Sequence, residues 1–133
     1  MSRRSRIAEA LDILRLLGLP KAQQNERTAL CLLALLNLTK AEAWAEAESP
    51  LVGITPMMEF AKKHYQRDYA PNTRETFRRF STHQLCQAGL VIYNPDDPTR
   101  PTNSPNAVYQ VAPETLALLR GFGAPEWPSR LDA

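Results

Sequence analysis

Apolar residues recur at helical spacing along most of this chain of 133 residues. Residues 5–17 place Ile7, Leu11 and Leu14 on one stripe, which predicts an amphipathic N-terminal helix. Residues 25–36 have almost no polar side, so we expect a buried helix there, at the centre of the core. Three further helices are expected, over residues 55–66, 72–89 and 113–121.

Capping residues mark the ends of these helices. Thr55 and Pro56 suit the N-cap and the first helical position of the helix at 55–66. Asn72 is a good N-cap for the following helix, and Glu75 can complete a capping box with it. Gly89 suits the left-handed position that ends many helices. The two helices are therefore separated by a tight turn at 67–71.

Short runs rich in β-branched residues predict strands at 51–54, 90–93 and 107–111. Between the last two strands, residues 94–106 contain four prolines, and all their other residues are polar or charged. Such a segment favours a long polar loop, and the strands on either side then form a hairpin whose tip projects into solvent.

The order of these elements is helix, short strand, helix, tight turn, helix, strand, polar loop, strand. That is the order of a winged helix-turn-helix, in which the hairpin is the wing. The fold class is therefore mainly α with a small β-hairpin wing. We expect one domain over residues 1–133, with a core at 20–112, an extra N-terminal helix at 5–17 and an extra C-terminal helix at 113–121.

The helix at 72–89 has two different sides. The side expected to be buried carries Thr73, Phe77, Phe80, Ser81, Gln84 and Ala88. The other side is basic and rich in hydroxyl groups, and it carries Arg74, Glu75, Arg78, Arg79 and Thr82.

Charge is distributed unevenly, although the net charge is only +2. Residues 61–90 hold six Lys and Arg against two acidic residues, a net of +4, so the remainder sums to −2. This polarity indicates either a patch that faces a polyanion or a solvated basic face, and charge alone leaves both open.

The side chains in this region suit contacts with duplex DNA. Arginine can pair with guanine, asparagine with adenine, and threonine with a polar base edge or a thymine methyl group. The base-reading candidates on the helix at 72–89 are Asn72, Thr73, Arg74, Thr76, Arg78, Arg79 and Thr82. The candidates for phosphate or wing contacts are Lys62, Lys63, Arg67 and Arg100. For each arginine the alternative is a solvated charge or an intrahelical pair with Glu75.

Nothing in the sequence indicates catalysis, a metal site or a cofactor. Residues 95–97 (PDD) match the start of a PD-(D/E)xK nuclease motif, but no strand with Glu-x-Lys follows, so we interpret them as turn residues. His64 and His83 lack a partner at useful spacing. Cys31 and Cys86 lack metal-ligand spacing and are expected to be buried thiols of a cytoplasmic chain. The longest apolar run is too short to span a membrane.

Three long strings are distinctive: LPKAQQNERTALCLLALLNL, ITPMMEFAKKHY and YAPNTRETFRRFSTHQLCQAGLVIYNPDDPTRPTNSPNAVYQV. They resemble the N-terminal helical domain of the BsuBI/PstI family of type II restriction endonucleases, over about residues 19–127. The resemblance implies a winged-helix domain that binds double-stranded DNA. In the full enzyme this domain precedes a Mg²⁺-dependent nuclease domain that cleaves CTGCAG sites. We expect that catalytic nuclease domain to be absent from these residues, so neither cleavage nor metal binding is carried over.

Two other roles remain open. The domain could be a structural or dimerisation module that docks on the nuclease domain of the parent protein or on a second copy. It could also be the DNA-binding domain of an associated methyltransferase or regulator.

Overall fold

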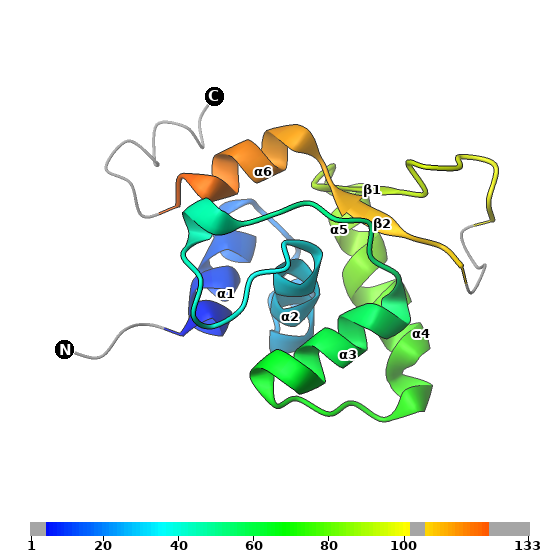
Figure 1. The fold of residues 1–133 in the computed structure, drawn as a ribbon, viewed down its shortest axis with the longest axis horizontal. Coiled ribbons are helices and arrows are strands. Elements are labelled where there is room, and N and C mark those ends of the chain that lie inside the picture. Colours follow the sequence, from blue (N-terminus) through cyan, green and yellow to red (C-terminus); the bar gives the residue numbers. More distant parts are fainter. Residues whose placement is uncertain (1–4, 102–105, 123–133) are drawn as a thin grey trace.

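The computed structural model describes residues 5–101 and 106–122. Its helices are α1 (Arg6–Leu16), α2 (Glu26–Leu35), α3 (Ile54–Tyr65), α4 (Arg74–Phe77), α5 (His83–Gln87) and α6 (Pro113–Arg120). Its strands are β1 (Val91–Tyr93) and β2 (Tyr109–Val111). A π-helical stretch at Arg78–Thr82, here called the π segment, joins α4 to α5 (Figure 1). We call the continuous helix at 74–87 the recognition helix.

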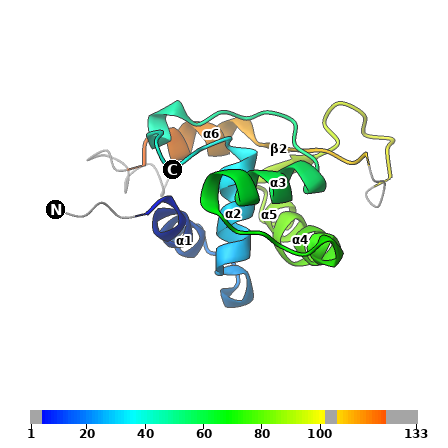
Figure 2. The same cartoon turned by 60° about the horizontal axis from the view of Figure 1, so that its bottom comes forward.

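Helix α2 is the centre of the core, as its apolar sequence predicts. Every residue from 28 to 36 is buried, and α2 lies between α1 and the recognition helix in both views (Figures 1 and 2). Asn25 caps it by accepting a hydrogen bond from the Thr28 backbone N–H at 2.9 Å. Helix α1 packs on it through Ala10, Ile13 and Leu14, all fully buried. No helix among the described residues is long and apolar enough to cross a membrane.

Helix α3 and the recognition helix form the helix-turn-helix pair. Gln66 ends α3 in a left-handed conformation, with φ of 54°, and a 3₁₀ turn at Pro71–Thr73 leads into α4. The Tyr65 hydroxyl donates a hydrogen bond of 2.7 Å to the Leu38 carbonyl, which ties the end of α3 to the chain beyond α2. The turn residue Tyr69 packs edge-on against Phe77, with ring centroids 5.0 Å apart.

The hairpin forms the wing. Strands β1 and β2 pair antiparallel, with Ile92 opposite Gln110. The expected strand at 51–54 is reduced to a single bridge, in which Val52 and Tyr109 exchange two backbone hydrogen bonds of 2.9 Å. The predicted winged helix-turn-helix is thus confirmed. The part of the wing loop at 102–105 lies outside the described residues.

Asn94 fixes the root of the wing loop. It is fully buried and adopts a left-handed conformation with φ of 47°, which asparagine tolerates better than most residues. Its side-chain amide donates to the Arg100 carbonyl at 2.9 Å and accepts from the Val108 backbone N–H at 3.0 Å. The loop therefore leaves β1 in a defined direction.

The extra helices close the opposite end of the domain. The segment around Trp44 forms a 3₁₀ turn, Trp44–Glu46, and the Trp44 indole donates to Glu9 on α1 at 3.2 Å. The same ring packs against Phe122, just after α6, at a centroid distance of 5.4 Å. Trp44 therefore links α1 to the end of α6.

Two predicted helix starts are wrong. Helix α3 begins at Ile54 with Gly53 as its N-cap, so Thr55 lies inside the first turn. Asn72 sits within the 3₁₀ turn rather than at an N-cap, and the Glu75 carboxylate binds Arg78 instead of completing a capping box. In both places the chain enters helical geometry earlier than the polar capping residue suggests.

The predicted end of the recognition helix is correct. Gly89 has φ of 80°, and its backbone N–H donates to the Cys86 carbonyl at 3.0 Å. The Leu90 N–H donates to the Leu85 carbonyl at 3.1 Å, which completes a Schellman motif. This turn sets the direction in which β1 departs.

The π segment changes which residues of the recognition helix are buried. The His83 backbone N–H donates to the Arg78 carbonyl, five residues back, so the helix holds one extra residue in this turn. Phe80 is 47% exposed, whereas the prediction placed it on the buried side; Ala88 is also exposed. Thr82 is fully buried, whereas the prediction placed it on the exposed side. A pattern read at 3.6 residues per turn cannot register the insertion.

Alanine substitution distinguishes the two phenylalanines of this helix. Phe77→Ala removes a fully buried ring and should lower the free energy of unfolding by about 3–5 kcal/mol. Phe80→Ala removes an exposed ring and should change it by no more than about 0.5 kcal/mol. Urea denaturation followed by circular dichroism measures both. Equal losses for the two variants would contradict the helix phase described above.

Candidate nucleic-acid interface

The recognition helix presents one outer side to solvent. Glu75, Arg79 and Phe80 are exposed on the helix, and Asn72 is exposed in the 3₁₀ turn just before it. Asn72, Glu75 and Arg79 are spaced three and four residues apart, as one face of a helix requires, and Phe80 directly follows Arg79. The predicted contacts that are partly exposed are Thr73, Arg74, Thr76 and Arg78. Thr82 is buried, and its hydroxyl lies 3.2 Å from the Cys31 sulfur and 3.7 Å from the Met57 sulfur. It packs the helix onto α2 and α3, so the prediction of a DNA contact by Thr82 is wrong.

Arg79 is the available cation on this outer side. Its guanidinium lies 5.5 Å from the centroid of the Phe80 ring, within reach of a cation–π contact. Among the described residues, no carboxylate lies within ion-pair distance of it. Arg79 can therefore bind an external acceptor without first breaking an internal ion pair.

Arg78 is engaged with Glu75. Its Nε donates to the Glu75 carboxylate at 3.1 Å and its terminal nitrogen forms a second contact with the same group. Its side chain is only 17% exposed. The hydrogen bond from Arg78 lowers the pKa of Glu75, and the same bond raises the pKa of Arg78. For this arginine the intrahelical pair, the alternative considered from the sequence, is present.

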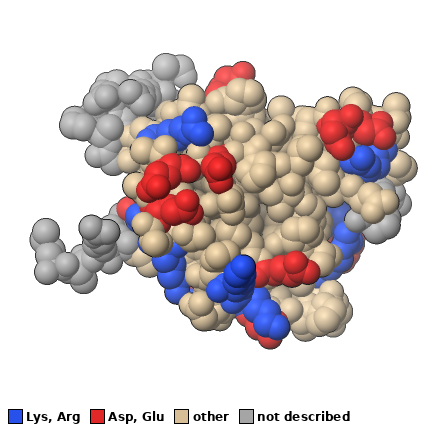
Figure 3. Space-filling view, viewed as in Figure 1, with Lys and Arg blue, Asp and Glu red and all other residues tan. Residues whose placement is uncertain are grey.

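Three cations extend the surface along α3 and the start of α4. Arg74 donates to the Thr55 hydroxyl at 3.2 Å, across the helix-turn-helix pair. Lys62 lies 3.7 Å from Asp68, with both side chains well exposed, and Lys63 is exposed beside it. On the face seen in Figure 3, basic side chains over α3 and α4 are interspersed with acidic ones. The local charge of +4 therefore overstates how uniformly basic this surface is.

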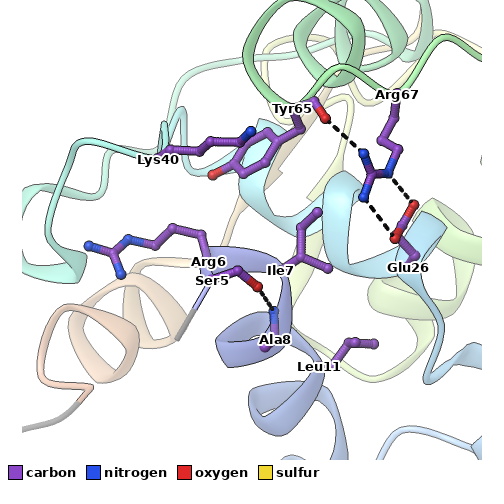
Figure 4. Close-up of a pocket in the computed structure, with 9 residues that line it drawn as sticks. All are labelled: Ser5, Arg6, Ile7, Ala8, Leu11, Glu26, Lys40, Tyr65 and Arg67. Atoms are coloured by element: carbon purple, nitrogen blue, oxygen red, sulfur yellow. Dashed lines mark hydrogen bonds and ion pairs between the residues drawn. The ribbon is translucent and has the colours of Figure 1, made fainter. Parts of the chain in front are cut away.

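Arg67 points toward α2. Its Nε donates to Glu26 at 2.7 Å and its terminal nitrogen donates to the Tyr65 carbonyl at 3.2 Å (Figure 4). The Glu26 contact raises the pKa of Arg67. The group borders a hollow of about 450 Å³ between α1, α2 and the end of α3, which no residue of the recognition helix lines. The geometry thus gives Arg67 a place in the junction between α2 and α3.

Arg100 stabilises the wing loop. Its two terminal nitrogens each lie 3.1 Å from an oxygen of Asp96, which lowers the pKa of that carboxyl. One of them also lies 3.3 Å from the Asn94 side-chain oxygen. Asp97 accepts from the Thr99 hydroxyl at 2.6 Å and from its backbone N–H at 3.2 Å. Asp96 and Asp97 thus serve the turn, as interpreted from the sequence.

Three side chains near the outer side were not among the predicted contacts. Phe80 was assigned to the buried side, and His83 was treated as an isolated histidine. Tyr93 is exposed on β1 and, with His83, Cys86 and Gln87, lines a hollow of about 230 Å³ between α5 and the wing. Burial, followed by the nearby charge of Arg78, lowers the pKa of His83, which favours the neutral imidazole at pH 7. The sequence signal that could have found His83 is its spacing of four residues from Arg79, which places two residues on one side of a regular helix.

Cysteine, histidine and carboxylate side chains, the usual metal ligands and nucleophiles, also occur among the described residues. No group of three His, Cys, Asp or Glu side chains that could hold a metal ion occurs within them. Cys31 is buried and Cys86 half-buried, both as free thiols. Burial raises the pKa of each thiol to about 12, so both are protonated at neutral pH and poor nucleophiles.

Residues 4–133 match the model of the BsuBI/PstI restriction endonuclease HTH domain. The chain belongs to this family. It is 60% identical over 127 residues to the type II restriction enzyme BsuBI of Bacillus subtilis, an alignment covering 96% of this chain and 40% of that enzyme. It is 38% identical over 124 residues to the type II restriction enzyme AplI of Arthrospira platensis (strain NIES-39 / UTEX 3086 / IAM M-135), covering 93% of the chain and 38% of the enzyme.

A solved structure in the same comparison is that of the SdaI restriction endonuclease. It matches 96% of this chain with a TM-score of 0.91 and 29% sequence identity, and the match covers 40% of that chain. The chain thus spans about 40% of the length of the relatives it matches. In those relatives the matched region is therefore one part of a longer chain.

The ion pair between Glu75 and Arg78 is testable by titration. The folded-state pKa of Glu75 lies below its ordinary value, so the pair's contribution to stability is present above the unfolded pKa and lost as pH falls through the folded one. Arg78→Ala should raise the pKa of Glu75 toward 4.5. Arg79→Ala, which removes only a nearby charge, should raise it less. The pKa of Glu75 in each variant is measured from its carboxyl chemical shift by NMR as a function of pH. A larger rise in this pKa for Arg79→Ala than for Arg78→Ala would refute the pairing.

Proposed function

We propose that this domain binds double-stranded DNA and positions the nuclease of a type II restriction endonuclease on it. The observation that carries the proposal is the outer side of the recognition helix, where Arg79 is exposed and has no internal ion pair among the described residues. The helix lies beside α3, on the side of the domain from which the wing extends (Figure 1). Membership of the restriction endonuclease HTH family supports the same role.

The recognition helix is proposed to enter the major groove. Helices of this type contact base edges through their N-terminal turns, which here present Asn72, Thr76 and Arg79. Arg79 has the geometry to bond O6 and N7 of a guanine, and Asn72 suits an adenine. The partly exposed Thr73 lies beside them. These side chains are proposed to read sequence, because the hydrogen-bonding groups on the base edges differ between base pairs.

Backbone phosphates are proposed to bind the cations around this helix. Lys62, Lys63 and Arg74 lie on α3 and at the start of α4, on either side of the turn. Such contacts fix register without reading sequence. Arg78 joins them only if it leaves Glu75, and Arg100 only if it leaves Asp96, so both have an internal competitor. Arg67 likewise has an internal competitor in Glu26, at 2.7 Å.

The finer features of the activity are proposed from the family resemblance. The target is a CTGCAG-type site, and cleavage with Mg²⁺ occurs in a nuclease domain of the parent protein, in the cytoplasm. The matched relatives are type II restriction enzymes, which favours this assignment over a methyltransferase or regulator. The present residues contribute binding and orientation to that reaction.

A structural role is the second candidate. Leu51, Ile92 and Tyr93 are each more than two-fifths exposed at or beside the root of the wing, and exposed apolar side chains favour protein contact. The partner would be the nuclease domain or a second copy. Light scattering across concentration separates the roles, because a stable dimer without DNA affinity would favour this candidate.

Binding should depend on salt and on Arg79. The full chain should bind a labelled duplex containing CTGCAG, and the logarithm of its association constant should fall linearly with the logarithm of salt concentration. Arg79→Ala should weaken binding by about 1–3 kcal/mol and reduce preference for that duplex over a scrambled one. Fluorescence anisotropy measures both.

Arg15→Ala is the matched control. Arg15 is an exposed arginine on α1, 61% exposed in its side chain, so the variant loses the same charge far from the recognition helix. Its affinity should stay near that of the unmodified chain. Folded protein that shows no salt-sensitive duplex binding would refute the proposed function. Equal losses of duplex affinity for Arg79→Ala and Arg15→Ala would show that Arg79 contributes only its charge and makes no specific contact.

A further inference from the structure

The recognition helix exposes an aromatic ring where its sequence alone would bury one. Phe80 is 47% exposed, whereas Phe77 is fully buried and Phe60 packs against the core. The ring lies next to Arg79 on the outer side, where the DNA would lie in the proposed function. An exposed ring gains by meeting an apolar partner, because contact removes both surfaces from water.

The π segment is what turns Phe80 outward. Ser81 and Thr82, the next two residues, are fully buried. The Ser81 hydroxyl accepts from Arg27 Nε at 2.9 Å and lies 2.9 Å from the Thr28 hydroxyl, both on α2. With these two residues fixed against α2, Arg79 and Phe80 must face solvent. π-Helical turns within α-helices occur often at functional sites.

Arg79 and Phe80 orient each other. The guanidinium carbon lies 5.5 Å from the ring centroid, so the cation and the aromatic face form one composite surface. In the major groove, the apolar group on a base edge is the C5-methyl group of thymine, and phenylalanine is among the side chains that contact it. Arginine bonds guanine through O6 and N7. Because Arg79 and Phe80 are in contact with each other, the bases that they meet would be neighbours.

We propose that Phe80 reads the methyl group of a thymine adjacent to a guanine bound by Arg79. The recognition helix then selects a step of thymine and guanine through one apolar and one charged contact. The inference rests on the proposed function, because it places this surface in the major groove. It adds a specificity determinant that contributes by shape and desolvation rather than by a hydrogen bond.

Removal of the methyl group tests the inference. The probe is a labelled duplex with one CTGCAG site, and its partner carries deoxyuridine in place of the single thymine of the site on each strand. The unmodified chain should bind the uracil duplex about fourfold more weakly, the factor expected for the loss of one buried methyl group. Phe80→Ala should lose this fourfold preference and keep only any general effect of uracil on the duplex. The difference between the preferences of the two chains cancels that general effect and isolates the contribution of the ring.

Leu51→Ala is the matched control, because Leu51 is also 47% exposed but lies outside the recognition helix. This variant should retain the preference for thymine. The inference is overturned if the unmodified chain binds both duplexes equally, or if Phe80→Ala keeps the preference. A ring that acts only as a wedge between base pairs gives the first of these results. In either case the duplex is still bound and the proposed function stands, whereas absence of binding to both duplexes refutes the two together.

Discussion

The attachment of the recognition helix to α2 through buried hydroxyl groups determines the rest of the interface. The Ser81 hydroxyl meets Arg27 and Thr28 at 2.9 Å each, and Thr82 lies against the sulfur atoms of Cys31 and Met57. Buried polar atoms must find partners inside the protein, because leaving one unsatisfied costs about 1–3 kcal/mol. These contacts are available in one rotational setting of the helix, and that setting requires the extra residue of the π segment.

The outer side follows from that setting. With Ser81 and Thr82 facing inward, Arg79 and Phe80 face outward, and Arg78 is left at the edge, where Glu75 binds it. Surface ion pairs stabilise little, typically less than about 1 kcal/mol, so such a pair is readily exchanged for a phosphate. Within the part of the chain that the structure describes, several cations of this surface are therefore paired, and its basic character depends on which pairs a ligand displaces.

The wing is held to the helices by a similarly small set of contacts. The single bridge between Val52 and Tyr109 joins the hairpin to the segment before α3, and buried Asn94 directs the loop. The direction of the wing relative to the recognition helix is set at both ends, by these contacts and by the Schellman turn at Gly89. Strand pairing of three residues is marginal alone, which explains why the hairpin depends on the helical core.

The sequence by itself determined the helices, the order of elements and the position of the basic region, because apolar spacing and Gly89 act locally. The central role of α2 was also evident, since a helix apolar on all sides must be buried. Only the tertiary structure decided which side of the recognition helix faces outward. The exposure of Phe80 and the burial of Thr82 depend on partners on α2 and α3 that are 25 to 54 residues away in sequence. The pairing of Arg67 with Glu26, 41 residues away in sequence, likewise depends on how the chain folds, and no periodicity encodes it.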